Sequence, residues 1–226
     1  MCSSDLWMHL WDKFTPVEET MRALDDLVRA GKVRYIGFSD TPAWKCAQAQ
    51  LVAQFLGWTP LIALQIEYSL FERTVEGELM PMARELGLGC TPWSPLRGGA
   101  LSGKYRRENA ATAKPPRGER VTNYLTESTF RIVDELIRIG AERGVSPATV
   151  AIAWVMARPG VSSPIIGART AEQLAQNLAA ADVALLPADI SALDAVSEPA
   201  LQFPMPFIKN IANSVMHGGA TVNGEP

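Results

Sequence analysis

The sequence predicts an α/β fold in which parallel strands alternate with helices in a single domain. Short apolar runs rich in β-branched and aromatic residues alternate with longer segments whose apolar residues recur at helical spacing. The chain has 226 residues, of which 47% are hydrophobic and 20% charged. This is ordinary globular composition, and the length is sufficient for a substantial core.

Composition also excludes several classes of protein. Lys and Arg number 21 against 24 Asp and Glu, so the net charge of −3 gives no basic footprint for nucleic acid. No apolar run approaches the roughly 18 residues of a membrane helix, and no signal peptide is recognisable. Cys2, Cys46 and Cys90 are odd in number and widely spaced, which argues against a disulfide framework and a zinc site. We expect a cytoplasmic protein without a metal, nucleic-acid or membrane partner.

The first half of the chain contains two strand–helix cycles. Asp5–Leu10 is a short apolar run, and Thr15–Glu18 is typical of a capping box that opens a helix ending at Gly31. Lys32–Phe38 predicts a strand because it is rich in β-branched and aromatic residues. The next cycle comprises a helix from Thr41 to about Leu56 and a strand over Leu61–Tyr68.

The second half continues the alternation around one long irregular stretch. We expect a helix over Glu76–Leu86, a strand over Gly89–Ser94, no regular structure over Pro95–Leu125, helices over Thr126–Arg143 and Pro147–Arg158, a strand over Val161–Ile166, and helices over Thr170–Ala181 and Pro187–Val196. Ser146 is the expected cap of the helix that begins at Pro147. The tail after Glu198 is expected to be irregular, and residues 218–226 disordered.

About five parallel strands fit two architectures, an open doubly wound sheet or part of a (β/α)₈ barrel. The sequence lacks the glycine-rich dinucleotide fingerprint, the phosphate-binding P-loop and the H-E-x-x-H zinc motif. Polar residues instead gather at or just after the expected strand ends, namely His9, Ser39, Asp40, Gln65, Ser94 and Gly167–Arg169. Barrels build their sites at the carboxyl ends of strands, so this placement favours the barrel.

Several of these segments together resemble the aldo/keto reductases, NADPH-dependent (β/α)₈ barrels. The resemblance is carried by Thr15–Asp40 (TPVEETMRALDDLVRAGKVRYIGFSD), Leu64–Arg73 (LQIEYSLFER), Met80–Tyr105 (around WSPLRGGALSGKY), Pro164–Leu178 (PIIGARTAEQLAQNL) and the closing segment Phe203–Gly219. It implies one domain over residues 1–226 that binds NADPH and reduces an aldehyde or ketone, a small carbonyl substrate, to an alcohol.

The resemblance also implies roles for individual residues. His9 resembles the catalytic histidine that hydrogen-bonds the substrate carbonyl, and Trp93 the aromatic residue that stacks on the nicotinamide. Asp40 stands where the family commonly has asparagine, and with two other residues it resembles the trio that holds the carboxamide: Ser39, Asp40 and Gln65. The diphosphate loop is matched by Ser94, Leu96, Gly99, Leu101 and Lys104, and the site for the adenosine and its 2′-phosphate by Gly167, Arg169, Gln173 and Asn177.

These residue types suit those groups chemically. A carboxamide needs both donors and acceptors, a diphosphate suits backbone N–H groups, glycine and lysine, and a 2′-phosphate favours arginine near a helix start. Each residue also has a structural alternative. His9 and Trp93 could be packing residues, Gly98 and Gly99 turn residues, and Arg169 a solvated residue at a helix start.

The family barrel has eight strands, and the resemblance covers only about the last five. Three of the family's four catalytic residues, an aspartate, a tyrosine and a lysine, belong to the three βα units for which no match is found. None of Tyr35, Tyr68, Tyr105 and Tyr124 lies in a context that would replace the tyrosine. We therefore expect an N-terminally truncated fragment that is inactive as written.

Residues 1–6 read like the translation of a sequencing adapter, which suggests an artefactual start. The alternatives to a reductase are a non-catalytic NADPH-binding or regulatory module, of which potassium-channel β subunits are a family example, and a fragment without autonomous function. The oligomeric state and the substrate are not predicted.

Overall fold

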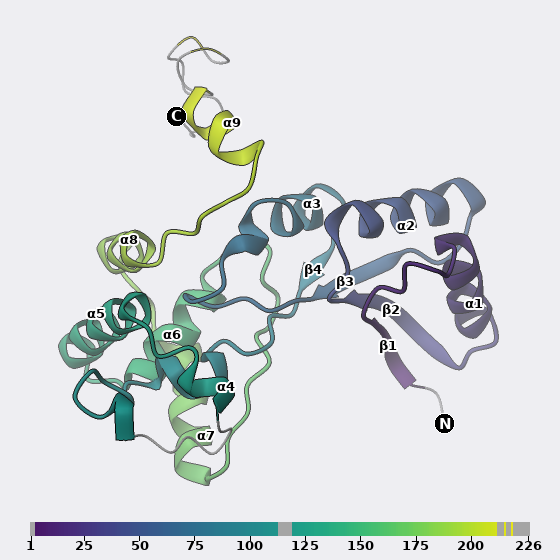
Figure 1. The fold of residues 1–226 in the computed structure, drawn as a ribbon. Helices are drawn as coiled ribbons and strands as arrows, with labels where there is room; N and C mark the ends of the chain where they lie inside the picture. Colours follow the sequence, from purple (N-terminus) through teal and green to yellow (C-terminus); the bar gives the residue numbers. More distant parts are fainter. Residues whose placement is uncertain (1–2, 113–118, 212–214, 216–217, 219–226) are drawn as a thin grey trace.

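The computed structural model describes residues 3–112, 119–211, 215 and 218. Figure 1 shows two lobes: one holds the sheet, and the other is built from helices. A short helix, α9 (Met205–Ile211), stands away from both at the end of an extended segment. No helix in the described part of the chain has the length and apolar character needed to cross a membrane.

The sheet lobe contains four parallel strands in the order β1-β2-β3-β4. They are β1 (Ser3–His9), β2 (Val33–Ser39), β3 (Leu61–Gln65) and β4 (Gly89–Cys90). The helices that connect them are α1 (Val17–Arg29), α2 (Ala43–Leu56) and α3 (Leu79–Glu85). Strand–helix alternation with parallel pairing confirms the predicted fold class, and within the described residues the sheet is open.

The helical lobe contains α4 (Glu119–Thr122), α5 (Glu127–Arg143), α6 (Pro147–Met156), α7 (Ala171–Leu178) and α8 (Pro187–Val196). Short 3₁₀ segments cover Thr74–Glu76, Arg97–Ser102, Ala110–Thr112 and Ala179–Asp182. The predicted cap of α6 is confirmed, because the Ser146 hydroxyl accepts a hydrogen bond from the backbone N–H of Thr149.

Three strands are shorter in the structure than the sequence predicts, and they are shortened at their carboxyl ends or lost. β3 ends at Gln65 and β4 at Cys90, and Val161–Ile166 forms no strand but only isolated bridges to Cys90 and Trp93. Pro92 and Pro164 lie inside the predicted strands. Proline has no N–H to donate to a ladder, so pairing continues there only as single bridges.

Several predicted helix boundaries are also wrong. Thr15 donates its hydroxyl to Asp12 instead of capping α1, so the predicted capping box does not form. The segment predicted to be irregular over Pro95–Leu125 contains α4 and two 3₁₀ turns, and α9 lies in the tail where none was predicted. The disorder predicted for 218–226 falls outside the described residues except at Gly218.

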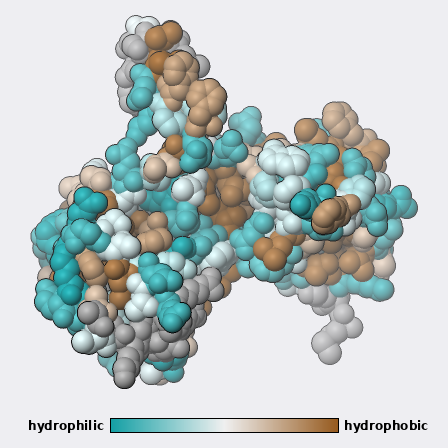
Figure 2. Space-filling view, viewed as in Figure 1, coloured by the Kyte–Doolittle hydropathy of each residue, from teal (hydrophilic) through white to brown (hydrophobic). Residues whose placement is uncertain are grey.

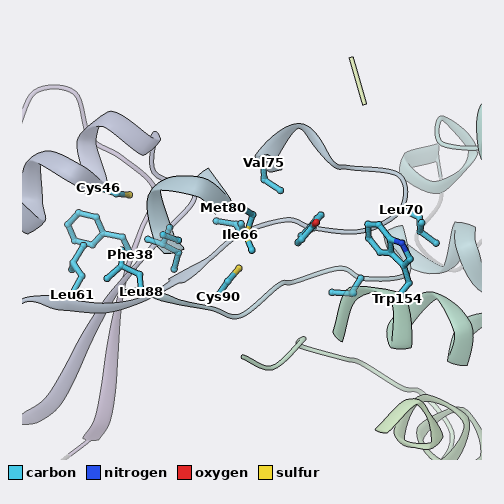
Figure 3. Packing of buried hydrophobic residues seen from close by; sticks show 14 of the residues in the cluster. Phe38, Cys46, Leu61, Ile66, Leu70, Val75, Met80, Leu88, Cys90 and Trp154 are labelled. Carbon is cyan, nitrogen blue, oxygen red and sulfur yellow. The ribbon is translucent and has the colours of Figure 1, made fainter. Parts of the chain in front are cut away.

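One apolar cluster runs through both lobes. In Figure 3 it extends from Phe38 and Leu61 in the sheet, past Cys90, to Leu70 and Trp154 in the helical lobe. Cys46 and Cys90 are free thiols inside it, and burial raises the pKa of each to about 12. Thiols held protonated in this way behave as small apolar side chains.

Arg73 joins the segment after β3 to α8. Its guanidinium donates to the Glu76 carboxylate at 2.8 and 3.0 Å, to the Asp194 carbonyl at 3.1 Å and to the Ser197 hydroxyl at 2.8 Å. It also lies over the Trp154 ring, and only 8% of its side chain is exposed. A buried charge with this many partners fixes the relative position of the elements that supply them.

Asp25 fixes the entry to β3 in a similar way. This carboxylate, 2% exposed, accepts from the Thr59 N–H at 2.8 Å, the Thr59 hydroxyl at 2.9 Å and Arg29 at 2.5 Å. Burial opposes ionisation, but the hydrogen bonds from Thr59 and Arg29 outweigh it and lower the pKa of Asp25.

Replacing Asp25 by Asn should lower the free energy of unfolding by about 1–3 kcal/mol, because buried donors lose a charged acceptor. The lowered pKa stabilises the fold above the unfolded value of about 4, and this stabilisation is lost as pH falls through the folded-state pKa. The difference in melting temperature between wild type and Asp25→Asn should therefore shrink on acidification. The control Asp26→Asn breaks an exposed pair with Arg22 and should change stability by less than about 0.5 kcal/mol. A difference that does not change with pH would contradict the assignment.

Arg73→Ala should cost about 3–5 kcal/mol of unfolding free energy, because it leaves Glu76 partly buried without its cation. The matched control is Arg107→Ala, which removes an arginine that also pairs with two acids, Glu127 and Asp134, but at the surface. That loss should stay below about 1 kcal/mol. Denaturant unfolding of the three proteins measures both values, and equal losses would show that Arg73 does not have this role.

Candidate functional site

A cavity of about 760 Å³ lies where the segments that follow β3 and β4 meet the helical lobe. Nine of the predicted site residues line it: Trp93, Ser94, Leu96, Gly99, Lys104, Gly167, Arg169, Gln173 and Asn177. The other lining residues are Glu67, Pro95, Gly98, Ser102, Val121, Tyr124, Ala148, Ile165, Ile166, Ala168 and Gln176. Segments that are far apart in the sequence therefore line one cavity.

The loop Ser94–Lys104 forms one wall through an unusual backbone. Ser94, Arg97, Gly98 and Gly99 all have positive φ, with Gly99 at 100°. Glycine adopts such angles without steric cost, whereas side chains rarely do. The Lys104 ammonium lies 3.1 Å from where a Gly99 Cβ would stand, so glycine also leaves room for this cation.

Arg169 lies in a loop that its neighbours hold in shape. The Arg169 N–H donates to the Gln173 side-chain oxygen at 3.1 Å, and the Asn177 amide donates to the Gly167 carbonyl at 3.3 Å. Thr170 caps α7 by accepting from the Gln173 N–H. Gln173 and Asn177 thus form hydrogen bonds within the loop itself. The Arg169 side chain is exposed and lines the cavity.

Lys104 and Arg169 make the cavity electropositive. Partial burial lowers the pKa of Lys104, and the neighbouring Arg169 charge lowers it further. Two cations that repel one another across a cavity favour an anion between them. A phosphate group fits this donor set.

Four of the five remaining predicted residues, His9, Ser39, Asp40 and Gln65, gather at the ends of β1, β2 and β3. The His9 Nδ1 lies 3.2 Å from the Ser39 hydroxyl and 3.8 Å from the Asp40 carboxylate. The Asp40 N–H donates to the Gln65 carbonyl at 3.2 Å, and the Trp93 indole N–H donates to Asp40 at 3.0 Å. Trp93 belongs to both groups, because it also lines the cavity.

The site is not a single hollow. His9 lines a second cavity of about 310 Å³, together with residues that include Trp11, Asp12 and Lys45. Ser39, Asp40 and Gln65 line neither of these two cavities, and Leu101 is fully buried in the core beneath the loop. The roles of these residues and of His9 stay predictions.

Sequence reasoning missed Arg97 and its partners. The guanidinium lies over the rings of Phe71 and Tyr124, 4.6 and 4.2 Å from their centroids, and forms an ion pair with Glu67. Glu67 and Tyr124 line the larger cavity. Tyr124 lies in Pro95–Leu125, the segment without hydrophobic periodicity, so its sequence context did not indicate that it lines the cavity.

Comparison with known proteins supports a single family. The model of the Aldo/keto reductase family matches residues 5–198, which includes Asp5 and Leu6 and excludes the Phe203–Gly219 segment expected to resemble the family. Similar proteins include the uncharacterized oxidoreductase YrpG of Bacillus subtilis (40% identical over 79% of this chain and 53% of that protein) and the putative aryl-alcohol dehydrogenase AAD10 of Saccharomyces cerevisiae (32% over 90% and 71%). A third is a probable voltage-gated potassium channel subunit beta of Oryza sativa subsp. japonica (39% over 84% and 60%).

The matched part of the chain spans between about half and seven tenths of the length of these relatives. The family is built on a (β/α)₈ barrel, with which the parallel strands and intervening helices of this structure agree. On the family match and on these relatives, the chain belongs to the aldo/keto reductase family.

Proposed function

We propose that the larger cavity binds NADPH, and that the protein is an oxidoreductase that interconverts an aldehyde or ketone with the corresponding alcohol. The observation that carries the proposal is the meeting of a positive-φ glycine loop, Lys104 and Arg169 around one cavity of about 760 Å³ that is bordered by Trp93. That size and mixed polar lining suit a dinucleotide better than a small ion.

The residues present fit the cofactor in its chemistry. Gly98, Gly99 and Lys104 would hold the diphosphate, because a loop without side-chain bulk lets a phosphate approach the backbone and the lysine neutralises its charge. Arg169 would hold the 2′-phosphate, where its planar guanidinium can donate two hydrogen bonds. Trp93 would form a platform for the nicotinamide ring, with Ser39, Asp40 and Gln65 near its carboxamide.

The bound cofactor supplies or accepts the hydride that separates an alcohol from its carbonyl compound. The chain's own contribution is position: Trp93 orients a flat ring, and His9 presents an imidazole nitrogen to the oxygen of the substrate. Relatives named aryl-alcohol dehydrogenase, and one named versiconal hemiacetal acetate reductase, support chemistry at alcohol and carbonyl groups. We place the protein in the cytoplasm on the basis of its sequence composition, and the buried, free thiols of Cys46 and Cys90 fit that location.

Cofactor preference tests the assignment of Arg169. Arg169→Ala should weaken NADPH binding about tenfold to a hundredfold, because a charge-assisted contact to phosphate is lost, and should leave NADH binding nearly unchanged. Lys104→Met should weaken both cofactors alike, because both carry the diphosphate. Fluorescence titration of the wild type and of both variants with each cofactor measures the six affinities. Equal weakening of NADPH and NADH by Arg169→Ala would refute a 2′-phosphate site.

The same titration, combined with an NADPH-oxidation assay on an aldehyde, separates the candidate functions. Binding with turnover supports the reductase. Binding without turnover supports a nucleotide-binding module built on the same cavity. If neither cofactor binds at concentrations up to about 1 mM, the upper end of typical enzyme KM values, the proposed site is wrong.

A further inference from the structure

Asp40 connects the two aromatic rings on which the proposed function depends. One carboxylate oxygen accepts from the Trp93 indole at 3.0 Å, and the other lies 3.8 Å from the His9 Nδ1. Asp40 follows β2 directly and has a φ of 49°, a conformation that Asp and Asn adopt more readily than most residues. Its backbone N–H is bonded to the Gln65 carbonyl, so the carboxylate projects from a fixed point.

A carboxylate at position 40 determines whether the neighbouring groups must donate or accept hydrogen bonds. When ionised it only accepts hydrogen bonds, whereas an asparagine at the same place would also offer two N–H donors. The Trp93 indole only donates, so its contact with Asp40 is unambiguous. The Ser39 hydroxyl, 3.2 Å from the His9 Nδ1, can donate or accept and so adapts to either imidazole tautomer.

We propose that Asp40 is a positioning residue that fixes the indole of Trp93 and holds the proton of neutral His9 on Nδ1. This role of Asp40 rests on the proposed function, because Trp93 and His9 are taken as the groups that face the cofactor and the substrate. One carboxylate oxygen accepts a hydrogen bond from the Trp93 indole, whereas the other acts on His9 Nδ1 electrostatically, at 3.8 Å, and the Ser39 hydroxyl at 3.2 Å is the hydrogen-bonding partner of Nδ1. The other charged residues that line the cavity of His9 are Asp12 and Lys45, and the His9 side chain is 65% exposed.

The tautomer of His9 determines whether its Nε2 accepts a hydrogen bond from a ligand or donates one to it. With the proton on Nδ1, the Nε2 of a neutral imidazole is an acceptor. It then matches the hydroxyl hydrogen of an alcohol, and it can donate to a carbonyl oxygen only when the ring carries both protons. An asparagine at position 40 could donate to Nδ1 and favour the opposite tautomer, with a hydrogen on Nε2. The carboxylate therefore sets which partner the neutral histidine recognises.

Nitrogen NMR of the labelled 226-residue chain, without cofactor, tests this directly. The sequence has two histidines, so a His217→Gln variant leaves His9 as the sole imidazole signal. In the neutral imidazole, Nδ1 should appear protonated and Nε2 unprotonated. A proton on Nε2 in the wild-type chain would overturn the proposal. Because no cofactor is added, a failed NADPH titration would affect the proposed function and not this result.

Asp40→Asn separates the two tasks of the carboxylate. The amide oxygen can still accept from the Trp93 indole, so the indole N–H resonance of Trp93 should stay at its wild-type position. A Trp93→Phe variant identifies this resonance among those of the six tryptophans. The His9 proton should move from Nδ1 to Nε2. An unchanged tautomer in this variant would overturn the proposal.

Two further variants exclude an indirect effect. Asp40→Ala should change the His9 tautomer and also shift the Trp93 indole resonance upfield, because both partners lose their acceptor. Ser39→Ala, which removes only the hydroxyl beside Nδ1, should leave the indole resonance unchanged and Nδ1 protonated. If Ser39→Ala instead transfers the proton to Nε2, the serine and not Asp40 sets the tautomer. Asn tolerates the positive φ at position 40, so Asp40→Asn keeps the test valid even if Asp40→Ala unfolds.

Discussion

The buried guanidinium of Arg73 is the constraint on which the arrangement of the two lobes depends. The sheet lobe reaches the helical lobe through the segment after β3, and Arg73 ties that segment to α8 through Ser197 and the Asp194 carbonyl. Asp194 in turn accepts from the Trp154 indole, so α6 is held by the same group of contacts. Because α6 forms part of the cavity wall, the shape of the cavity follows from charges buried outside it. The apolar residues between the lobes, visible as brown surface in Figure 2, add non-directional adhesion but cannot by themselves fix an angle.

Arg97 acts as a second clamp, nearer the cavity. Its ion pair with Glu67 and its contacts with the rings of Phe71 and Tyr124 join the positive-φ loop to the segment after β3 and to the residues after α4. Consecutive left-handed residues are costly outside glycine, and Arg97 itself has a φ of 48°. A partly desolvated cation stacked on two rings can offset that cost, since such contacts strengthen when water is excluded. The contacts of the Arg97 guanidinium with the two rings therefore help to hold the strained backbone of the loop in place.

Sequence reasoning succeeded where a pattern depends on local chemistry. The apolar spacing of Val17, Met21 and Leu24 gave α1, and Ser146 gave the start of α6, because each depends only on residues within one or two turns. It failed at Thr15, whose hydroxyl bonds Asp12 three residues earlier instead of capping a helix, and at Pro92 and Pro164, where predicted strands are reduced to single bridges. At the site, the strand-end residues, Arg169 among them, were predicted from their place after the expected strands, and Lys104 from the resemblance to the family. The Glu67–Arg97–Tyr124 cluster was not, because its members lie in three unrelated segments.

The reduced strand pairing gives Trp93 its particular role. Its backbone N–H donates to the Ile66 carbonyl at 2.8 Å, and isolated bridges connect it to Glu67 on one side and Ile165 on the other. Its position is thus fixed by backbone on both flanks, although no continuous strand runs through it. The side chain then borders the larger cavity while its indole N–H reaches Asp40 and, through it, the surroundings of His9. Trp93 therefore connects the larger cavity, which its side chain lines, to the strand-end cluster, which its indole contacts through Asp40.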